Sequence, residues 1–171
     1  ACCYAISSMG KSSRAAKITG TASLKDILLM NDCGADHVVD FTYFGYPSTY
    51  MMEEDKLLEM FRNFDGKYGN NPKNYIVVEF ADGIFQRETA MLLKIPEIQE
   101  RIDKLIFCAP DSIAVYGGIK ALHEKFALTP DAISGLCSSS PLAIREIEEF
   151  TDIPILQSME KNYEKIFNII K

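Results

Sequence analysis

The fold expected of this chain is decided by the stretch Ala5-Ile6-Ser7-Ser8-Met9-Gly10-Lys11-Ser12, at the end of the apolar run Ala1–Ala5. It is close to the pattern G-x-x-x-x-G-K-[ST], in which a loop between a buried strand and a helix points backbone N–H groups at phosphate oxygens. The lysine of that pattern reaches the β- and γ-phosphates, and the hydroxyl binds Mg²⁺. Ala5 stands where the pattern has its first glycine. Because alanine tolerates a positive φ less well than glycine, either the turn differs or the match is accidental.

We therefore expect a strand over Ala1–Ala5, a phosphate-binding loop, and a helix that begins at Ser12 and Ser13. The cofactor-binding residues of that loop would be Ser7, Ser8, Met9, Gly10, Lys11, Ser12 and Ser13. The next residues, Arg14–Gly20, are typical of a second strand and leave no room for the helix. Since a parallel crossover takes about a dozen residues, we expect a segment to be missing between Ser13 and Arg14, and residues to be missing before Ala1. A trace that joins Ser13 to Arg14 in a compact turn would contradict the missing segment.

Composition places the chain among ordinary globular proteins. Of its 171 residues, 47% are hydrophobic and 25% are charged, and we expect a single nucleotide-binding domain over 1–171. The net charge of −6, without a basic block, argues against a nucleic-acid partner. No run approaches the roughly 18 apolar residues of a membrane span, so no membrane partner is expected. We interpret the 5 cysteines as reduced thiols of a cytoplasmic protein, and the histidines, His37 and His123, do not suggest a zinc site.

Strand-like and helical patterns alternate along the rest of the chain. Apolar or β-branched runs indicate strands at His37–Phe41, Tyr75–Phe80, Leu105–Ala109, Ala132–Gly135 and Ile153–Leu156. Helical patterns lie between and after them at Leu24–Cys33, Glu53–Phe64, Ile113–Lys125, Ser138–Phe150 and Asn162–Ile170. This alternation predicts an α/β fold, a three-layer α/β/α sandwich with a mostly parallel sheet. Ligands of such sheets bind beyond the carboxyl ends of the strands.

Several polar residues fall at those expected strand ends. Glu79 and Asp82 close the strand Tyr75–Phe80, where a nucleotide-binding fold holds Mg²⁺ or a metal-bound water; solvated acids of an ordinary turn are the alternative. Arg87 follows shortly after, and it either balances phosphate or substrate charge or forms a plain salt bridge. The aromatic and hydroxyl-rich loop Thr42–Tyr50 either walls a binding cleft or packs as a surface loop.

These residues resemble the P-loop NTPases of the dethiobiotin-synthetase and MobB type over most of the chain. The resemblance rests on the phosphate loop, on Lys17-Ile18-Thr19-Gly20 and on Val77-Val78-Glu79. It implies a P-loop NTPase fold, a Lys17 near the transferred phosphate and the substrate, and a Glu79 that binds Mg²⁺. This chain departs from the dethiobiotin-synthetase pattern, because it lacks the proline after the lysine and has Asp82 where that family has glycine.

A closer resemblance is to an uncharacterised P-loop group. The shared stretches are Lys-Ile-Thr-Gly-Thr from Lys17, the loop Gly45–Tyr50, and Glu-Phe-Ala-Asp-Gly-Ile-Phe-Gln-Arg-Glu-Thr over Glu79–Thr89. That group is distantly similar to the P-loop domain of D-glutamate N-acetyltransferase-like proteins, which keeps acyl transfer open.

Together these patterns predict an enzyme that binds ATP or GTP with Mg²⁺ and activates a small acidic or amide substrate by phosphoryl transfer. Lys11 would neutralise phosphate charge and Ser12 would hold Mg²⁺ together with Glu79 or Asp82, while Lys17 and Arg87 would face substrate or phosphate. Two alternatives stay open: a nucleotide-dependent accessory or switch protein of the MobB type, and an acyltransferase. The resemblance also allows a homodimer.

Overall fold

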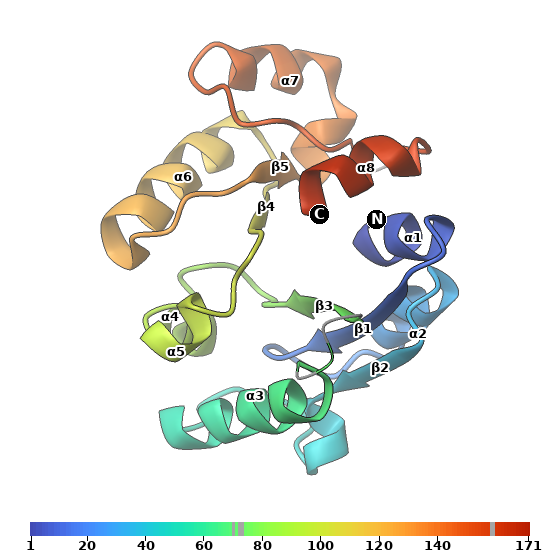
Figure 1. Cartoon of the computed structure of the whole chain (residues 1–171). Helices are drawn as coiled ribbons and strands as arrows, with labels where there is room; N and C mark the ends of the chain where they lie inside the picture. The colour runs from blue at the N-terminus through green and yellow to red at the C-terminus, as the bar shows by residue number, and fades with distance from the viewer. Residues whose placement is uncertain (70, 72–73, 158–159) are drawn as a thin grey trace. The chain divides into compact units, whose positions relative to one another are not determined.

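The computed structural model describes residues 1–69, 71, 74–157 and 160–171. Contacts group the chain into two compact units, Cys2–Ile95 and Pro96–Lys171, and each is described by itself (Figure 1). The single domain expected over 1–171 stays a prediction. Among the described residues, no helix is both long and apolar enough to cross a membrane.

The first unit is built on a parallel sheet with the strand order β2-β1-β3. Its elements are α1 (Cys2–Ser8), β1 (Ser12–Lys17), α2 (Leu24–Asp32), β2 (His37–Asp40), the 3-10 helix η1 (Phe41–Phe44), α3 (Glu54–Tyr68), β3 (Asn74–Glu79) and α4 (Arg87–Leu92). Figure 1 shows α1 above this sheet and α3 below it. In the register, Lys17 lies opposite Asp40 on one side and Glu79 on the other. The carboxyl ends of the strands therefore meet at one edge of the sheet.

The chain begins with a helix, so the strand expected over Ala1–Ala5 is wrong. Cys3, Ala5 and Ile6 are the buried residues of α1. The helix ends in a Schellman motif, in which Gly10 N–H donates to Ser7 O at 2.9 Å and Lys11 N–H donates to Ile6 O at 3.1 Å. Gly10 takes the left-handed conformation that this motif requires, with φ +67°. A short apolar run fits a buried strand and a buried helix equally well, which explains the error.

The helix expected to begin at Ser12 and Ser13 is wrong as well, because these residues open the central strand. Ser13 pairs with Tyr75 and Arg14 pairs with Ile76 in one uninterrupted register. Ser13 and Arg14 are joined in an extended strand and not in the compact turn that would contradict a missing segment, so the expected gap between them stays a prediction. Only a short turn precedes β1, and α2 makes the crossover from β1 to β2.

The second unit carries its own pair of parallel strands, β4 (Ile106–Cys108) and β5 (Ala132–Ser134). Its other elements are α5 (Pro96–Gln99), α6 (Ser112–Phe126), the 3-10 helix η2 (Leu136–Ser139), α7 (Pro141–Glu148) and α8 (Tyr163–Ile170). The expected strand Ile153–Leu156 is reduced to a single bridge between Ile133 and Ile155. Asp111 caps α6 by accepting from Ala114 N–H at 2.7 Å, and Ser140 caps α7.

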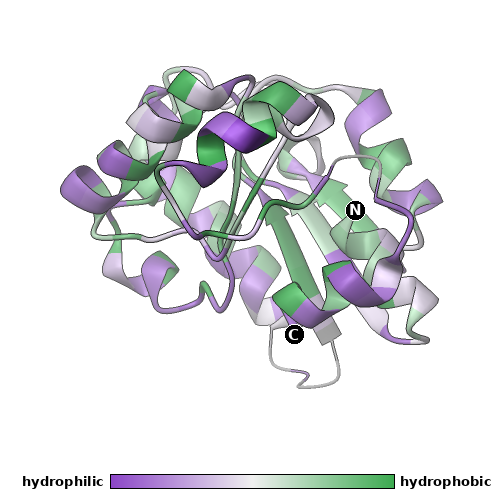
Figure 2. Cartoon of the chain, turned by 90° about the horizontal axis from the view of Figure 1, so that it is seen from above, coloured by the Kyte–Doolittle hydropathy of each residue, from purple (hydrophilic) through white to green (hydrophobic). Residues whose placement is uncertain are grey.

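Each unit buries its own apolar residues. In the first unit, Cys3, Ala15 and Ala35 form a core cluster between α1, β1 and the end of α2. In the second, the core cluster contains Ala109, Val115, Ile133, Cys137 and Ile147. Figure 2 shows hydrophobic residues along the strands and hydrophilic residues on many outer helical turns. The structure thus confirms a mixed α/β chain with parallel strand pairing.

Candidate functional site

The candidate site lies at the carboxyl edge of β2-β1-β3, where Lys17, Asp40 and Glu79 end their strands in register. Side chains that follow parallel strands converge at this edge, which is the usual place for ligands of such sheets. The Asp40 carboxylate has a structural role, because it accepts hydrogen bonds from the backbone N–H and the hydroxyl of Thr42 and caps η1. Lys17 and Glu79 are therefore the strand-end residues to consider further.

Lys17 is a buried cation, with 5% of its surface exposed. Its Nζ donates to Asp26 Oδ2 at 2.5 Å and to the carbonyl oxygen of Thr21 at 3.0 Å. Asp26 lies in the first turn of α2 and its side chain is 33% exposed. Sequence patterns did not single out Asp26, because its pairing with Lys17 depends on the turn that connects β1 to α2.

The side chains of Asp82 and Lys17 both pack against Gly20. Its φ is +111°, and a Cβ at this position would lie 3.1 Å from Asp82 Oδ2 and 3.3 Å from Lys17 Cε. The same Cβ would lie 3.1 Å from Ala81 Cβ. Asp82 itself has a left-handed backbone, with φ +70°. The glycine of the Thr19-Gly20 turn therefore leaves space beside it for both the β1 lysine and the carboxylate after β3.

The charged side chains of this cluster act on the ionisation of Glu79. Burial is the main cause of a raised pKa for its carboxyl group, and the negative charges of Asp26 and Asp82 raise the pKa further. The Lys17 ammonium acts in the opposite direction and lowers it, without reversing the shift. A carboxyl group whose pKa is moved toward neutral pH is suited to accept or donate a proton.

Hydroxyl groups fix the Thr19-Gly20 turn from two sides. Thr49 Oγ1 accepts from Gly20 N–H at 2.9 Å, and Gly20 O accepts from Thr49 N–H at 2.9 Å and from Ser48 Oγ at 3.2 Å. On the other side, Thr89 Oγ1 lies 3.0 Å from Thr19 Oγ1 and donates to Ala81 O at 2.9 Å. The loop Gly45–Tyr50 is thus packed against the turn at the site, while Tyr50 itself is 77% exposed.

Arg87 and Glu88 join the start of α4 to the residues after that loop. Arg87 Nη1 donates to Met52 O at 2.8 Å and to Glu88 Oε1 at 3.0 Å. Glu88 is 1% exposed and accepts from Met51 N–H at 2.8 Å and from Gln86 Nε2. The salt bridge expected as the alternative for Arg87 is therefore present. Glu88 was not predicted as a site residue, although the polar run at the start of α4 was the available signal.

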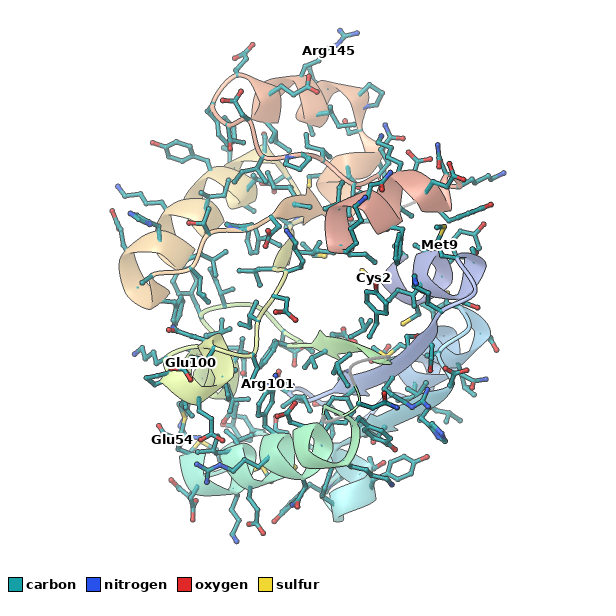
Figure 3. All side chains as sticks on the ribbon, in the orientation of Figure 1. Cys2, Met9, Glu54, Glu100, Arg101 and Arg145 are labelled. Carbon is teal, nitrogen blue, oxygen red and sulfur yellow. The ribbon has the colours of Figure 1, made fainter. Side chains whose placement is uncertain are left out.

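The expected loop residues Ser7–Ser13 lie elsewhere. Lys11 is exposed at the turn between α1 and β1, and Ser12 Oγ donates to Asp36 Oδ2 at 2.5 Å. Figure 3 labels Met9 at the end of α1. At roughly 3.3 Å per residue, Ser12 lies about 16 Å along β1 from Lys17. Since a phosphate loop requires a strand followed by a helix, the phosphate-loop interpretation of Ala5–Ser12 is wrong.

The donor set at the carboxyl edge suits a hard cation only in part. Glu79 and Asp82 offer carboxylate oxygens, which are the ligands that Mg²⁺ prefers. Among the described residues, no group of at least 3 His, Cys, Asp or Glu side chains is arranged to hold a metal ion. An Mg²⁺ at this edge would therefore need further oxygen ligands from water or from a phosphate.

Comparisons with known proteins give the chain no family. No protein-family model matches it, and no curated protein matches it. The functional argument therefore rests on the residues of the site itself.

Proposed function

We propose that the chain is an enzyme that binds ATP or GTP with Mg²⁺ and transfers a phosphoryl group to a small anionic substrate at the carboxyl edge of β2-β1-β3. The observation that carries the proposal is the buried Lys17 ammonium, which acts on the charge of Glu79 and belongs to a side chain that packs, like Asp82, against Gly20. A lysine shielded from water at a strand end is a strong partner for phosphate oxygens. The parallel strands β2-β1-β3 and the crossover helix α2 support a ligand site beyond the carboxyl ends of these strands.

Each residue has a separate role in this proposal. Lys17 neutralises phosphate or substrate charge, and Glu79 and Asp82 hold Mg²⁺ directly or through water. Bound Mg²⁺ would supply charge stabilisation to the phosphate oxygens. Glu79 also takes up a proton readily, because its pKa is raised mainly by burial. Arg87 acts through Glu88 and the Met51–Met52 backbone, so we assign it a positioning role.

The location proposed for this enzyme is the cytoplasm. Among the described residues no disulfide joins Cys2, Cys3, Cys33, Cys108 or Cys137, and Cys3 and Cys137 are buried. Burial raises the pKa of Cys3 to about 11, which keeps it in the unreactive thiol form. Reduced buried thiols are typical of a reducing compartment.

Two lysine variants test the proposal, because they lie at opposite ends of β1. Lys17→Met removes the buried ammonium and keeps most of the stem, whereas Lys11→Ala removes an exposed ammonium near the amino end. Calorimetric titration with Mg·ATP and Mg·GTP should show binding by the unaltered chain and by Lys11→Ala, and at least tenfold weaker binding by Lys17→Met. Equal binding by Lys17→Met and the unaltered chain would overturn the proposal.

Turnover separates the enzyme from the alternatives. NTP-dependent consumption of a small carboxylate, found by screening metabolites, supports phosphoryl transfer. Hydrolysis that responds to no metabolite would favour an accessory or switch protein of the MobB type. Binding of an acyl-CoA, with indifference to the γ-phosphate, would favour acyl transfer.

A further inference from the structure

The ion pair between Lys17 and Asp26 joins a buried cation to a partly exposed anion. The side chain of Lys17 is 7% exposed and that of Asp26 is 33% exposed, with Nζ and Oδ2 2.5 Å apart. The other acceptor of Nζ is the backbone carbonyl of Thr21. Both acceptors belong to the segment that directly follows β1. A ligand would therefore reach the Lys17 ammonium through this segment, at the partly exposed Asp26.

The first turn of α2 is held in place weakly. The helix has no fully buried residue, and Ser23 occupies the N-cap position without a side-chain hydrogen bond to the helix. Leu24 is 67% exposed and Leu28 is 49% exposed. Packing on the core cluster involves Met30, in the second half of the helix. Since segments with few buried contacts open most readily, the first turn can separate from the site while the rest of α2 stays packed.

The side chains around Lys17 carry more negative than positive charge, so they disfavour an additional anion. Asp26 pairs with Lys17, Asp82 packs on Gly20 beside Lys17 Cε, and Glu79 feels the charges of both carboxylates. A ligand phosphate or carboxylate added to this set would face net negative charge. It gains a partner only if it takes the position of Asp26 on Nζ. Asp26, on a turn without buried residues, is the easiest of these groups to displace.

We infer that Asp26 occupies the position of the ligand's anionic group on Lys17, and that the ligand displaces the first turn of α2 when it binds. The inference rests on the proposed function, because both use Lys17. It extends the proposed function by defining the class of ligand that binds there. The ligand presents a terminal phosphate or carboxylate to a single buried ammonium. The first turn of α2 therefore covers Lys17 until an anion displaces Asp26.

Removal of the internal competitor tests the inference. Asp26→Asn should bind inorganic phosphate about fivefold more tightly than the unaltered chain, the factor that corresponds to one partly exposed ion pair. The titration is done without Mg²⁺ and without nucleotide, and a second titration with acetate distinguishes a phosphate ligand from a carboxylate ligand. The anion whose affinity rises identifies the ligand group. Equal or weaker binding of both anions by Asp26→Asn, or no binding by either chain, would overturn the inference.

Asp36→Asn is the matched control, because it makes the same change in another ion pair of β1. Asp36 Oδ2 lies 2.7 Å from Arg14 Nη1, at the amino end of the strand. Its loss should leave anion affinity unchanged. An equal rise in Asp36→Asn would mean that net charge alone sets the affinity, and the inference would fail.

Hydrogen exchange of the unaltered chain provides a measurement that does not depend on a variant. Saturating phosphate should increase amide exchange in the first turn of α2 and leave α3 unchanged. Unchanged or slower exchange in that turn would overturn the inference. If Mg·NTP still binds through Lys17 in that case, the proposed function survives while the inference fails.

Discussion

Thr19 Oγ1 and Thr89 Oγ1 lie 3.0 Å apart, and both are within hydrogen-bonding distance of the carbonyl oxygen of Ala81, at 3.3 and 2.9 Å. Both threonines are buried, with at most 1% of their surface exposed. Thr19 follows β1, Ala81 follows β3 and Thr89 belongs to α4. The pair therefore ties the Thr19-Gly20 turn to the segment that carries Asp82.

This relationship predicts a cooperative effect of threonine loss. Thr89→Val should destabilise the chain by about 1 kcal/mol, because Thr19 can still donate to Ala81 O. Thr19→Val together with Thr89→Val should cost more than the sum of the single variants, because a buried carbonyl loses both donors. Urea unfolding of the double-mutant cycle measures the difference. Thr21→Val, an exposed threonine of the same turn, is the control, and strict additivity of Thr19→Val and Thr89→Val would contradict the shared carbonyl.

Gly20→Ala should damage both stability and the site. A Cβ at Gly20 would lie 3.1 Å from Asp82 Oδ2 and from Ala81 Cβ, in a backbone with φ +111°. Gly83→Ala introduces a similar backbone strain, with φ +99°, but its Cβ would meet nothing within 4 Å. We expect a left-handed penalty of roughly 1 kcal/mol in both variants and a further loss in Gly20→Ala alone. Thermal unfolding of the two variants, compared with the unaltered chain, measures this difference. Equal losses of stability in the two variants would show that the space beside Gly20, where Asp82 and Lys17 pack, does not need to stay empty of a side chain.

The sequence predicted the carboxyl edge of the first unit better than its beginning. The β-branched residues before Glu79 indicate a strand, and Lys17 ends a second one, so their positions follow from local pattern. The run Ala1–Ala5 carries no such preference, because a few apolar residues fit either a strand or a helix. Gly10 then favoured the wrong interpretation, since a glycine that ends a helix and a glycine that begins a phosphate loop look alike in sequence.

The partners of the site residues could not be predicted from the sequence. Asp26 and Thr89 reach Lys17 and Thr19 through the folding of separate segments, and no spacing rule connects them. From its composition the loop Thr42–Tyr50 is expected either to wall a binding cleft or to pack as a surface loop, and in the structure Ser48 and Thr49 bond to Gly20. The packing of this loop against Gly20 depends on the hydroxyls of Ser48 and Thr49 and on one backbone hydrogen bond, and no local pattern connects these residues to Gly20.

Glu79→Gln should stabilise the chain at neutral pH. The pKa of Glu79 is raised above its ordinary value, chiefly by burial, so the folded chain holds the proton more tightly than the unfolded chain does. Its contribution to stability is therefore largest at low pH and declines as pH rises through the raised pKa. The advantage of Glu79→Gln should shrink as pH falls below the ordinary glutamate pKa. Urea unfolding across pH 3 to 8 (about one pH unit per step) checks this, with Glu59→Gln on an exposed face of α3 as the control. A variant less stable than the unaltered chain at neutral pH would contradict the raised pKa.

Glu88→Gln should have the opposite sign. Burial alone would raise the pKa of Glu88, but hydrogen bonds from its own backbone N–H, Arg87, Met51 and Gln86 outweigh it and lower the pKa. The stabilisation is therefore present above the ordinary glutamate pKa and is lost as pH falls through the lowered value. At neutral pH we expect a loss of about 2 kcal/mol, because hydrogen bonds to a charged acceptor are weakened.

The loss in Glu88→Gln has a structural reason that can be separated from charge. Glutamine keeps one oxygen for Met51 N–H and Arg87 Nη1, which both donate to Glu88 Oε1, but turns an amide toward Gln86 Nε2, which is itself a donor. Met51 has φ +60°, and that strained backbone depends on its bond to Glu88. Glu53→Gln, which removes the exposed partner of Arg87 at 3.8 Å, should change stability by less than about 0.5 kcal/mol. Urea unfolding at neutral and acid pH distinguishes the two glutamates. If Glu53→Gln lost as much stability as Glu88→Gln, the exposed ion pair would carry the stability. The buried carboxylate would then not position the loop.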